Sequence, residues 1–493
     1  MVPMDDFQVL ITAEEAWPAF ERAVLEAESE ILAGFRIFDM RTRLRSPEAQ
    51  AVGETWFDLL ADALERGVKI RLIMSDFDPV IATDLHELTW QTMRQAAGLS
   101  EIARPAPGQL EVIADMHPAE AGLLPWVALL PAVAMKWREK LRQIGSIRRK
   151  LRAVRLDPDR LPGLHPVSHH QKIAVIDGKV LYIGGLDLNE RRWDTLDHDR
   201  PAIETWSDVQ ILIRGPEAEE AQTHLREMLD TTSGRAEPTP LNAVRRTLSA
   251  PRRVQFPFLS PRTVANEIEQ DHLEAFSRAR HLIHIETQFL RSSIISHALA
   301  EAATANPELR LVLILPALPD DVAFDGSREL DAQFGMARQS QAISRVSEAF
   351  GKRAVFASPV QPRFAARDTP QVLAGSPIVY VHNKLLVVDE DFAMVGSANL
   401  NGRSLHWDTE AAIRIREPDR IAALRAALFR HWWTDPLPPE ARDPATLQPW
   451  WAREIARNGV CRPESRSGFL VPHKSDALSE YHTDLPGVTE DLV

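Results

Sequence analysis

The feature that most constrains this chain is a stretch of sequence that occurs twice. Residues 170–191, HQKIAVIDGKVLYIGGLDLNER, align without a gap on residues 382–403, HNKLLVVDEDFAMVGSANLNGR, at an offset of 212. Eight aligned positions are identical, where ordinary residue usage gives about one or two by chance. Several mismatches are conservative, such as Ile173 against Leu385. Two copies of one long pattern predict a duplicated half-molecule rather than a solenoid of many units.

The segments that precede each copy predict two similar α/β halves. In the first half, strand-like stretches at 29–39 and 68–77 enclose the helical TWFDLLADALERG. In the second half, strand-like stretches at 281–290 and 309–318 enclose the helical SIISHALAEAATAN in the same order. We therefore expect an α/β protein with two α/β/α halves related by a pseudo-twofold axis and an active site at their interface.

A cluster of prolines and turn residues in TTSGRAEPTPLNAVRRTLSAP predicts where the two halves meet. We expect an N-terminal half over 1–235 with the first copy, a linker over 236–252, and a C-terminal half over 253–434 with the second copy. The remaining residues, 435–493, are rich in Pro, Trp and charge, and we expect them to form an irregular C-terminal extension.

The overall composition is that of an ordinary globular protein. Hydrophobic residues make up 44% of the 493 and charged residues 26%. The net charge of −13 disfavours nucleic-acid binding through bulk electrostatics. The single cysteine, Cys461, excludes a disulfide within the chain. No secretory signal pattern and no apolar run of the roughly 20 residues that span a bilayer occur. These features predict a cytoplasmic location, with association to a membrane surface left open.

Each copy of the repeat contains a His-x-Lys pair that suits phosphodiester cleavage. Because residues i and i+2 of a strand share a face, His170 projects with Lys172, and His382 with Lys384. One neutral imidazole can attack phosphorus, and the other can protonate the leaving alkoxide and then activate water. The lysines can offset charge on the phosphoryl oxygens, so the scheme needs neither metal nor cofactor. A lone His-x-Lys is usually a packed core pair, but the duplication at equal spacing favours catalysis.

The duplicated H-x-K-x-x-x-x-D, each copy followed by G-[GS]-x-[DN], resembles the signature of the phospholipase D superfamily. The stretches GGLDLNERRWDTLDH, TWSDVQILIRGP, IETQFL and YVHNKLLVVDEDFAMVGSANLNGRSLHWDTE are similar to motifs of eukaryotic-type phospholipase D catalytic cores. The resemblance extends over most of 30–435 in order and spacing and is specific only around the motifs. The sequence departs from it at Ser207, where the family has histidine, and at Thr287, where it has asparagine.

The resemblance implies a role for each residue that matches a motif. His170 would be the nucleophile and His382 the general acid and base, while the carboxylates of Asp208 and Glu410 would orient the two histidines. The remaining expected roles are phosphate contacts for Lys172, Lys384, Asn399 and Ser397, close backbone approach to the phosphate for Gly184 and Gly185, pocket bracing for Glu286 and Gln288, and structural support for Asp177 and Asp389.

The substrate needs a separate argument, because this superfamily chemistry also serves nucleases and phospholipid synthases. The apolar stretch 121–135 is followed by 136–155, which holds nine Lys or Arg against one Glu. This order fits peripheral binding to an anionic membrane through 121–155, or equally a helical insertion that packs its apolar part on the core.

We therefore expect a monomeric phospholipase D that converts phosphatidylcholine-like glycerophospholipids to phosphatidic acid and a headgroup alcohol through a phosphohistidine. An alcohol acceptor in place of water would give transphosphatidylation. The alternatives are a cardiolipin-synthase-type phosphatidyltransferase, a nuclease or other phosphodiesterase, and a non-catalytic membrane scaffold. We expect no nucleic-acid partner.

Overall fold

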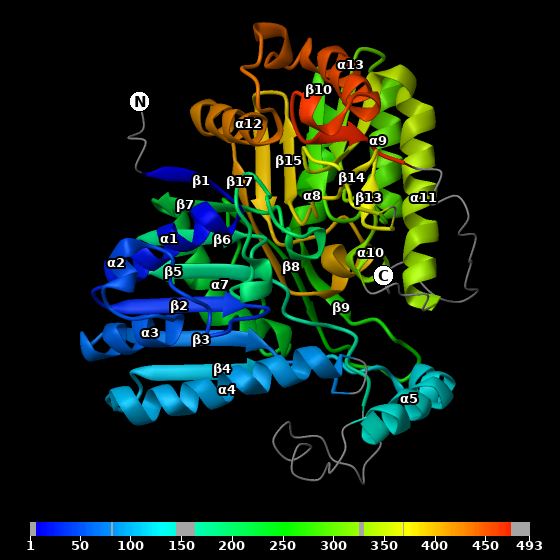
Figure 1. The fold of residues 1–493 in the computed structure, drawn as a ribbon. Helices are drawn as coiled ribbons and strands as arrows, with labels where there is room; N and C mark the ends of the chain where they lie inside the picture. Colours follow the sequence, from blue (N-terminus) through cyan, green and yellow to red (C-terminus); the bar gives the residue numbers. More distant parts are fainter. Residues whose placement is uncertain (1–5, 80–81, 144–162, 325–329, 368, 475–493) are drawn as a thin grey trace.

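The computed structural model describes residues 6–79, 82–143, 163–324, 330–367 and 369–474, and two large β-sheets organise them (Figure 1). The first sheet has the strand order β1-β7-β6-β5-β2-β3-β4, and the second has the order β18-β12-β11-β10-β15-β16-β17-β8-β9. The order β7-β6-β5-β2-β3-β4 of the first sheet recurs in the second as β17-β16-β15-β10-β11-β12. The duplication in the sequence is therefore a duplication of the fold, which confirms the expected α/β class.

The strands expected at 29–39, 68–77, 281–290 and 309–318 are all present. The strands of the first sheet are β1 (Phe7–Ile11), β2 (Glu30–Phe35), β3 (Lys69–Ser75), β4 (Leu110–Asp115), β5 (Lys172–Ile176), β6 (Val180–Gly184) and β7 (Val209–Arg214). Those of the second are β8 (Val244–Ala250), β9 (Arg262–Asn266), β10 (Leu282–Thr287), β11 (Arg310–Ile314), β12 (Ala354–Pro359), β15 (Lys384–Val388), β16 (Phe392–Gly396), β17 (Glu410–Ile415) and β18 (Leu470–Pro472). A separate hairpin joins β13 (Val372–Leu373) and β14 (Ser376–Pro377).

Some helices cover the outer face of each sheet, and others pack against the core that the two sheets share. The helices of the first half are α1 (Thr12–Leu25), α2 (Pro47–Gln50), α3 (Trp56–Glu65), α4 (Thr83–Ala103), α5 (Leu123–Gln143) and α7 (Glu217–Thr232). Those of the second are α8 (Glu267–Arg278), α9 (Ser293–Ala305), α10 (Asp320–Ala323), α11 (Leu330–Phe350), α12 (Pro418–Trp432) and α13 (Leu447–Val460). Among the residues described, none of these helices is both long and apolar enough to cross a membrane.

The two halves share one hydrophobic core, and alternation along the strands builds it. Ile173 and Val175 of β5 point into a core that also holds Leu385 and Val387 of β15. The intervening residue of β5, Ala174, points into a second core beneath the helices of the first half. Because side chains alternate across a strand, the inner faces of both sheets pack together and bring corresponding strands of the two halves close to each other.

Two of the predicted boundaries need correction. The linker expected over 236–252 contains β8, which pairs with β17 inside the second sheet. Its sequence VRRTLSA carries two adjacent arginines that hide the strand pattern, and Arg246 is fully buried in ion pairs with Glu227 and Glu267. The extension expected to be irregular contributes α13 and β18, and β18 pairs with β12 at the sheet edge.

Candidate active site

The two His-x-Lys segments are held by strand-like contacts that cross between the halves. Strand β5 begins at Lys172, so His170 lies just before the strand rather than within it. The backbone N–H of His170 donates to the carbonyl of Thr409 at 2.8 Å, and that of His382 donates to the carbonyl of Ser207 at 2.8 Å. Each histidine therefore lies beside the residues that lead into a strand of the opposite half, β17 for His170 and β7 for His382.

As a result, each histidine is paired with a carboxylate from the opposite half. The Nδ1 atom of His170 lies 2.9 Å from Oε1 of Glu410, and the Nδ1 atom of His382 lies 2.6 Å from Oδ2 of Asp208. Both carboxylates are buried, whereas the side chains of His170 and His382 keep 12% and 7% of their surface exposed. A carboxylate at Nδ1 fixes the ring and leaves Nε2 as the reactive nitrogen.

The two lysines are buried beside the histidines in matching geometry. Lys172 Nζ donates to the carbonyl of His170 at 2.5 Å, and Lys384 Nζ donates to that of His382 at 2.5 Å. Lys384 also donates to Oε1 of Gln288 at 3.4 Å, and Lys172 lies 3.8 Å from Oδ2 of Asp187. In each half, the hydrogen bond to the histidine carbonyl therefore holds the lysine amine near that histidine.

Burial and neighbouring charge shift the pKa values of the histidines and carboxyls in opposite directions. Burial, then the charge of Lys172, holds the pKa of His170 well below its usual range. Burial, then the charge of Lys384, does the same for the pKa of His382. Burial raises the pKa of Asp208 to about 7 and that of Glu410 to about 8, against the lowering effect of the lysines. The site without an anion therefore favours neutral imidazoles.

The lysines respond to the same surroundings. Burial lowers the pKa of Lys384 to about 7, although the charge of Asp208 raises it. Burial also lowers the pKa of Lys172, with Asp187 acting against it. His170 contributes to the lowered pKa of His382, so groups of both halves act on one another across a single site.

The serine and the glycines that follow the two motifs differ in what they contact. Ser397 Oγ donates to the Glu410 carboxylate. Gly185 takes the corresponding place in the first half, where a Cβ would overlap the Asp208 carboxylate. A Cβ at Gly184 would overlap the side chain of Gln210 and the backbone of β7. The two glycines make room for β7 and for Asp208. The expected close approach of their backbone to the phosphate stays a prediction.

The motif aspartates hold backbone rather than line the site. Asp177 accepts bonds from the backbone N–H groups of residues 28, 29 and 30 at 2.8, 2.7 and 2.9 Å. Asp389 accepts the N–H groups of residues 280, 281 and 282 at 2.7, 2.9 and 2.8 Å. Each carboxylate thus fixes the start of the strand that neighbours its own motif strand, β2 or β10.

Glu286, in β10, and Gln288, just after it, contact different partners. Glu286 is buried and accepts from Nδ2 of Asn383 at 2.5 Å and from Nε1 of Trp432 at 2.8 Å. Gln288 donates to the hydroxyl of Tyr380 at 2.8 Å while it accepts from Lys384. Gln288 therefore positions Lys384 directly. Glu286 does not contact the lysine and instead holds Asn383, the residue between His382 and Lys384.

Three residues beside the site were not predicted from the sequence. Trp206 packs on the ring of His382 with centroids 4.5 Å apart, and the Arg192 guanidinium lies 3.6 Å from the Trp206 centroid. Arg36 is the structural counterpart of Gln288, because Phe35 pairs with Lys172 as Thr287 pairs with Lys384. The register of β2 against β5 reveals this equivalence. The sequence repeat does not, because Arg36 and Gln288 lie outside the aligned residues.

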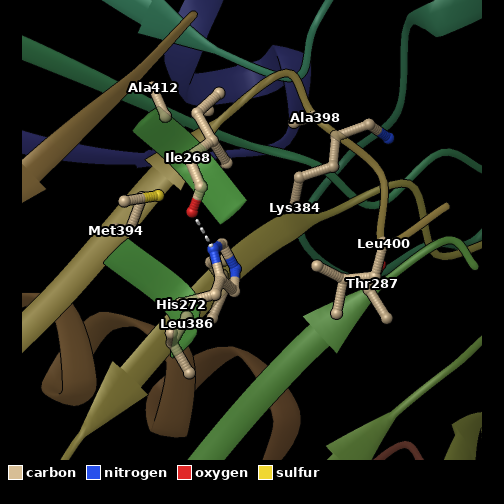
Figure 2. A pocket seen from close by; sticks show the side chains of 11 residues that line it. Ile268, His272, Thr287, Lys384, Leu386, Met394, Ala398, Leu400 and Ala412 are labelled. Carbon is tan, nitrogen blue, oxygen red and sulfur yellow. Dashed lines mark hydrogen bonds between the residues drawn. The ribbon is translucent and has the colours of Figure 1, made fainter. Parts of the chain in front are cut away.

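Asn399 belongs to the second half of the site, and a small cavity lies next to it. Asn399 is buried, and its Oδ1 has no hydrogen-bond partner among the residues described. A cavity of about 10 Å³ lies beside Lys384 and Leu386 of β15. Figure 2 shows the side chains that line it, among them His272, whose Nδ1 donates to the carbonyl of Ile268 at 2.8 Å. The amine of Lys384 points away from the His272 ring (Figure 2). Within the described ranges, no cluster of three or more His, Cys, Asp or Glu could hold a metal ion.

Comparison with known proteins places this geometry in a family. Residues 273–433 match the sequence family described as "Cardiolipin synthase, PLD-like domain". Phospholipase D1 of Saccharomyces cerevisiae is 26% identical over 348 residues, which cover 52% of this chain and 20% of that protein. Phospholipase D alpha 1 of Oryza sativa is 21% identical over 378 residues, covering 53% of this chain and 47% of the relative. These matches support the phospholipase D superfamily as the family that this chain resembles.

Other members of the superfamily match it at similar levels. Cardiolipin synthase 2 of Bacillus anthracis is 24% identical over 266 residues, covering 52% of this chain and 43% of the relative. The matched stretches thus cover less than half of these three relatives. The crystal structure of a phosphatidylserine synthase of Haemophilus influenzae superposes with a TM-score of 0.50 at 13% identity, over 92% of this chain and 93% of that one. That likeness shows a shared fold.

Proposed function

We propose that this chain is a phospholipase D that hydrolyses the distal phosphodiester bond of glycerophospholipids. The products would be phosphatidic acid and the free headgroup alcohol. The observation that carries the proposal is the pair of buried histidines, each bonded at Nδ1 to a carboxylate of the opposite half and each beside a buried lysine. Two reactive Nε2 atoms and two ammonium groups supply the nucleophile, the acid and the charge that phosphodiester cleavage needs.

In the first step, the Nε2 lone pair of His170 forms a bond to phosphorus as the bond from phosphorus to the headgroup oxygen breaks. The leaving oxygen takes the Nε2 proton of His382. A bound phosphodiester brings a negative charge beside His382, which opposes the effect of Lys384 and raises the pKa of this histidine. Substrate binding would therefore favour the protonated acid that the free site disfavours.

In the second step, water attacks phosphorus and gives a proton to Nε2 of His382, while the bond between phosphorus and His170 breaks. Phosphatidic acid then leaves, and both imidazoles return to their starting forms. Lys172 and Lys384 would offset the charge on the non-bridging oxygens in both steps. An alcohol in place of water would give a new phosphatidyl ester by the same proton transfers.

A phosphatidyltransferase of the cardiolipin-synthase type is the second candidate. The family description matched by residues 273–433 and the 24% identity to a cardiolipin synthase favour it. The chemistry differs only in the acceptor that attacks the phosphohistidine, so the residues of the site serve either reaction.

Product analysis decides between hydrolysis and transfer. The protein is incubated with phosphatidylcholine, with phosphatidylglycerol alone, and with single-stranded DNA, and the products are identified by mass spectrometry. We expect phosphatidic acid and choline, both lost in His170→Ala. Cardiolipin from phosphatidylglycerol, without phosphatidic acid, would favour the transferase. Cleaved DNA with inert lipids would refute both.

Trapping the covalent intermediate tests the assignment of the two histidines. Reaction with a phospholipid labelled at phosphorus, followed by a rapid alkaline quench, should leave the label on the peptide that contains His170. The label should persist longer in His382→Ala, because that variant lacks the base for the second step. Label on His382 in the wild-type protein would reverse the two roles.

A further inference from the structure

We infer that α5 and the loop between β8 and β9 together form one membrane-docking surface for anionic phospholipid bilayers. We call this surface the α5–loop patch and define it by seven side chains: Leu123, Leu124, Val127 and Met135 of α5, and Val254, Phe256 and Phe258 of the loop. All seven are among the exposed large hydrophobic residues. The inference rests on the proposed function, since it assigns the surface through which the enzyme would meet its lipid.

The side of α5 that faces away from the protein is apolar. Leu123, Val127, Pro131 and Met135 follow one another at intervals of four residues, and all four are exposed. The opposite side of the helix, with Val133, is the side that is buried. A helix on the surface of a protein normally shows the reverse pattern, with its polar side outward. The helix α5 therefore carries apolar side chains on its exposed side as well as on its buried side.

The loop is fixed to the start of α5 by backbone bonds. The N–H of Gly122 donates to the carbonyl of Phe258 at 2.8 Å, and that of Leu124 donates to the carbonyl of Phe256 at 3.0 Å. A Cβ at Gly122 would overlap the backbone carbonyls of Gln255 and Phe256, so this close approach needs glycine. The two segments, more than a hundred residues apart in sequence, thus present a single surface (Figure 1).

Hydrogen bonds within the loop also fix its backbone, so its exposed side chains are held in place. The N–H of Phe258 donates to the carbonyl of Gln255 at 2.9 Å, and Gln255 Nε2 returns a bond to the carbonyl of Phe258 at 3.0 Å. The Arg252 guanidinium lies 4.5 Å from the centroid of the Phe258 ring and donates to the carbonyl of Ser260. The turn therefore holds Phe256 at its outer side.

Charge around the patch selects the kind of partner. Exposed arginines follow the apolar residues on α5, at Arg138 and Arg142, and adjoin the apolar residues of the loop, at Arg253 and Arg262. Apolar side chains next to cations match a bilayer that offers acyl chains beneath anionic headgroups. The net charge of the whole chain is −13, so this cationic rim runs against the general charge of the molecule. Residues 144–155, the rest of the predicted basic run, lie outside the described residues.

Vesicle binding tests the surface, with one variant from each segment and a matched control. Leu123→Ser and Phe256→Ser remove side chains that are 57% and 56% exposed, and Phe364→Ser removes one that is 58% exposed on a different loop. All are placed in a His170→Ala background, so that lipid is not consumed. Co-sedimentation is measured with vesicles of phosphatidylcholine plus phosphatidylglycerol and of phosphatidylcholine alone.

We expect each patch variant to bind the anionic vesicles about tenfold more weakly and the control to bind like the parent. Arg253→Gln should weaken binding to the anionic vesicles and not to the neutral ones. Equal binding by patch variants and control would overturn the inference. So would loss of self-association in the patch variants with unchanged vesicle binding, because the patch would then serve a second copy of the chain.

A soluble substrate separates this inference from the proposed function. With His170 intact, Leu123→Ser and Phe256→Ser should cleave monomeric short-chain phosphatidylcholine within about twofold of the wild-type rate and lose about tenfold on vesicles. If wild-type protein cleaves neither form while vesicle binding still depends on the patch, the proposed function fails and the docking surface stands.

Discussion

Replacing Asp389 should cost stability and leave chemistry intact. Its carboxylate accepts three backbone N–H groups at 2.7 to 2.9 Å at the start of β10, and the residue itself has a φ of 51°. Hydrogen bonds to a charged group contribute about 1.5 to 3 kcal/mol each. Two of the donors belong to exposed residues, where water can replace the carboxylate, and the third, on Leu282, is buried. We therefore expect Asp389→Ala to lower the free energy of unfolding by about 3 kcal/mol.

A series at this position separates the contributions. Asp389→Asn keeps one acceptor oxygen and tolerates a positive φ, so it should cost about 1 to 2 kcal/mol. Asp389→Gly should be about 1 kcal/mol less costly than alanine, because glycine adopts this backbone conformation freely. Asp391→Asn, which alters a 71% exposed neighbour, is the control and should change stability by less than about 0.5 kcal/mol.

Urea unfolding followed by the fluorescence of the twelve tryptophans measures the stability of each variant. Turnover of soluble short-chain phosphatidylcholine, measured at a temperature where every variant is folded, should stay within about twofold of wild type. The reasoning is refuted if Asp389→Asn keeps the wild-type urea midpoint and loses more than about a hundredfold in turnover, a loss typical of a group in general acid–base catalysis.

Three further predictions follow from the site and its supports. Gly185→Ala should displace the Asp208 carboxylate from His382 and lower turnover about a hundredfold or more, while Gly98→Ala, whose Cβ would meet only one atom at 3.8 Å, should leave turnover unchanged. Sulfate binding near pH 6 should take up about one proton, because an anion raises the lowered pKa of His382; calorimetric heats that are equal in buffers of different ionisation enthalpy would contradict this. Partial burial raises the pKa of Asp177, but its bonds to backbone N–H groups outweigh that effect and hold the pKa below its usual value. Its stabilisation is therefore present above the unfolded-state pKa and is lost as pH falls through the folded-state pKa, so Asp177→Asn should flatten the acid side of the stability profile.

The sequence alone predicts the repeated fold, because the strongest patterns in the chain are local. The strand β5 and its partner β15 carry unbroken apolar runs, and the helices between neighbouring strands keep their own periodicity. Strand β8 escaped prediction because Arg245 and Arg246 stand in it, and their burial depends on acidic partners on α7 and α8. A strand whose polarity is balanced by distant residues carries no local signal.

The candidate site also has features that the sequence predicts and features that it does not. The repeat indicates that the two histidines belong together, and the resemblance to the phospholipase D superfamily adds the two carboxylates, but neither shows which carboxylate meets which histidine. The pairing of His170 with Glu410 and of His382 with Asp208 arises from backbone contacts between the halves. Arg36 and Trp206 were missed for a related reason, because strand register and tertiary packing, rather than the repeat, bring them to the site.

The exchange of carboxylates has a consequence for how such a chain can arise and change. A half-molecule alone holds a histidine without the group that orients it, so a single ancestral half would gain a complete pair only by associating with its twin. Once fused, the two halves no longer need identical sequences. The halves can then differ, as at Gly185 against Ser397, Asp187 against Asn399 and Arg36 against Gln288. Such differences would suit the separate roles proposed for the two histidines, attack and proton transfer.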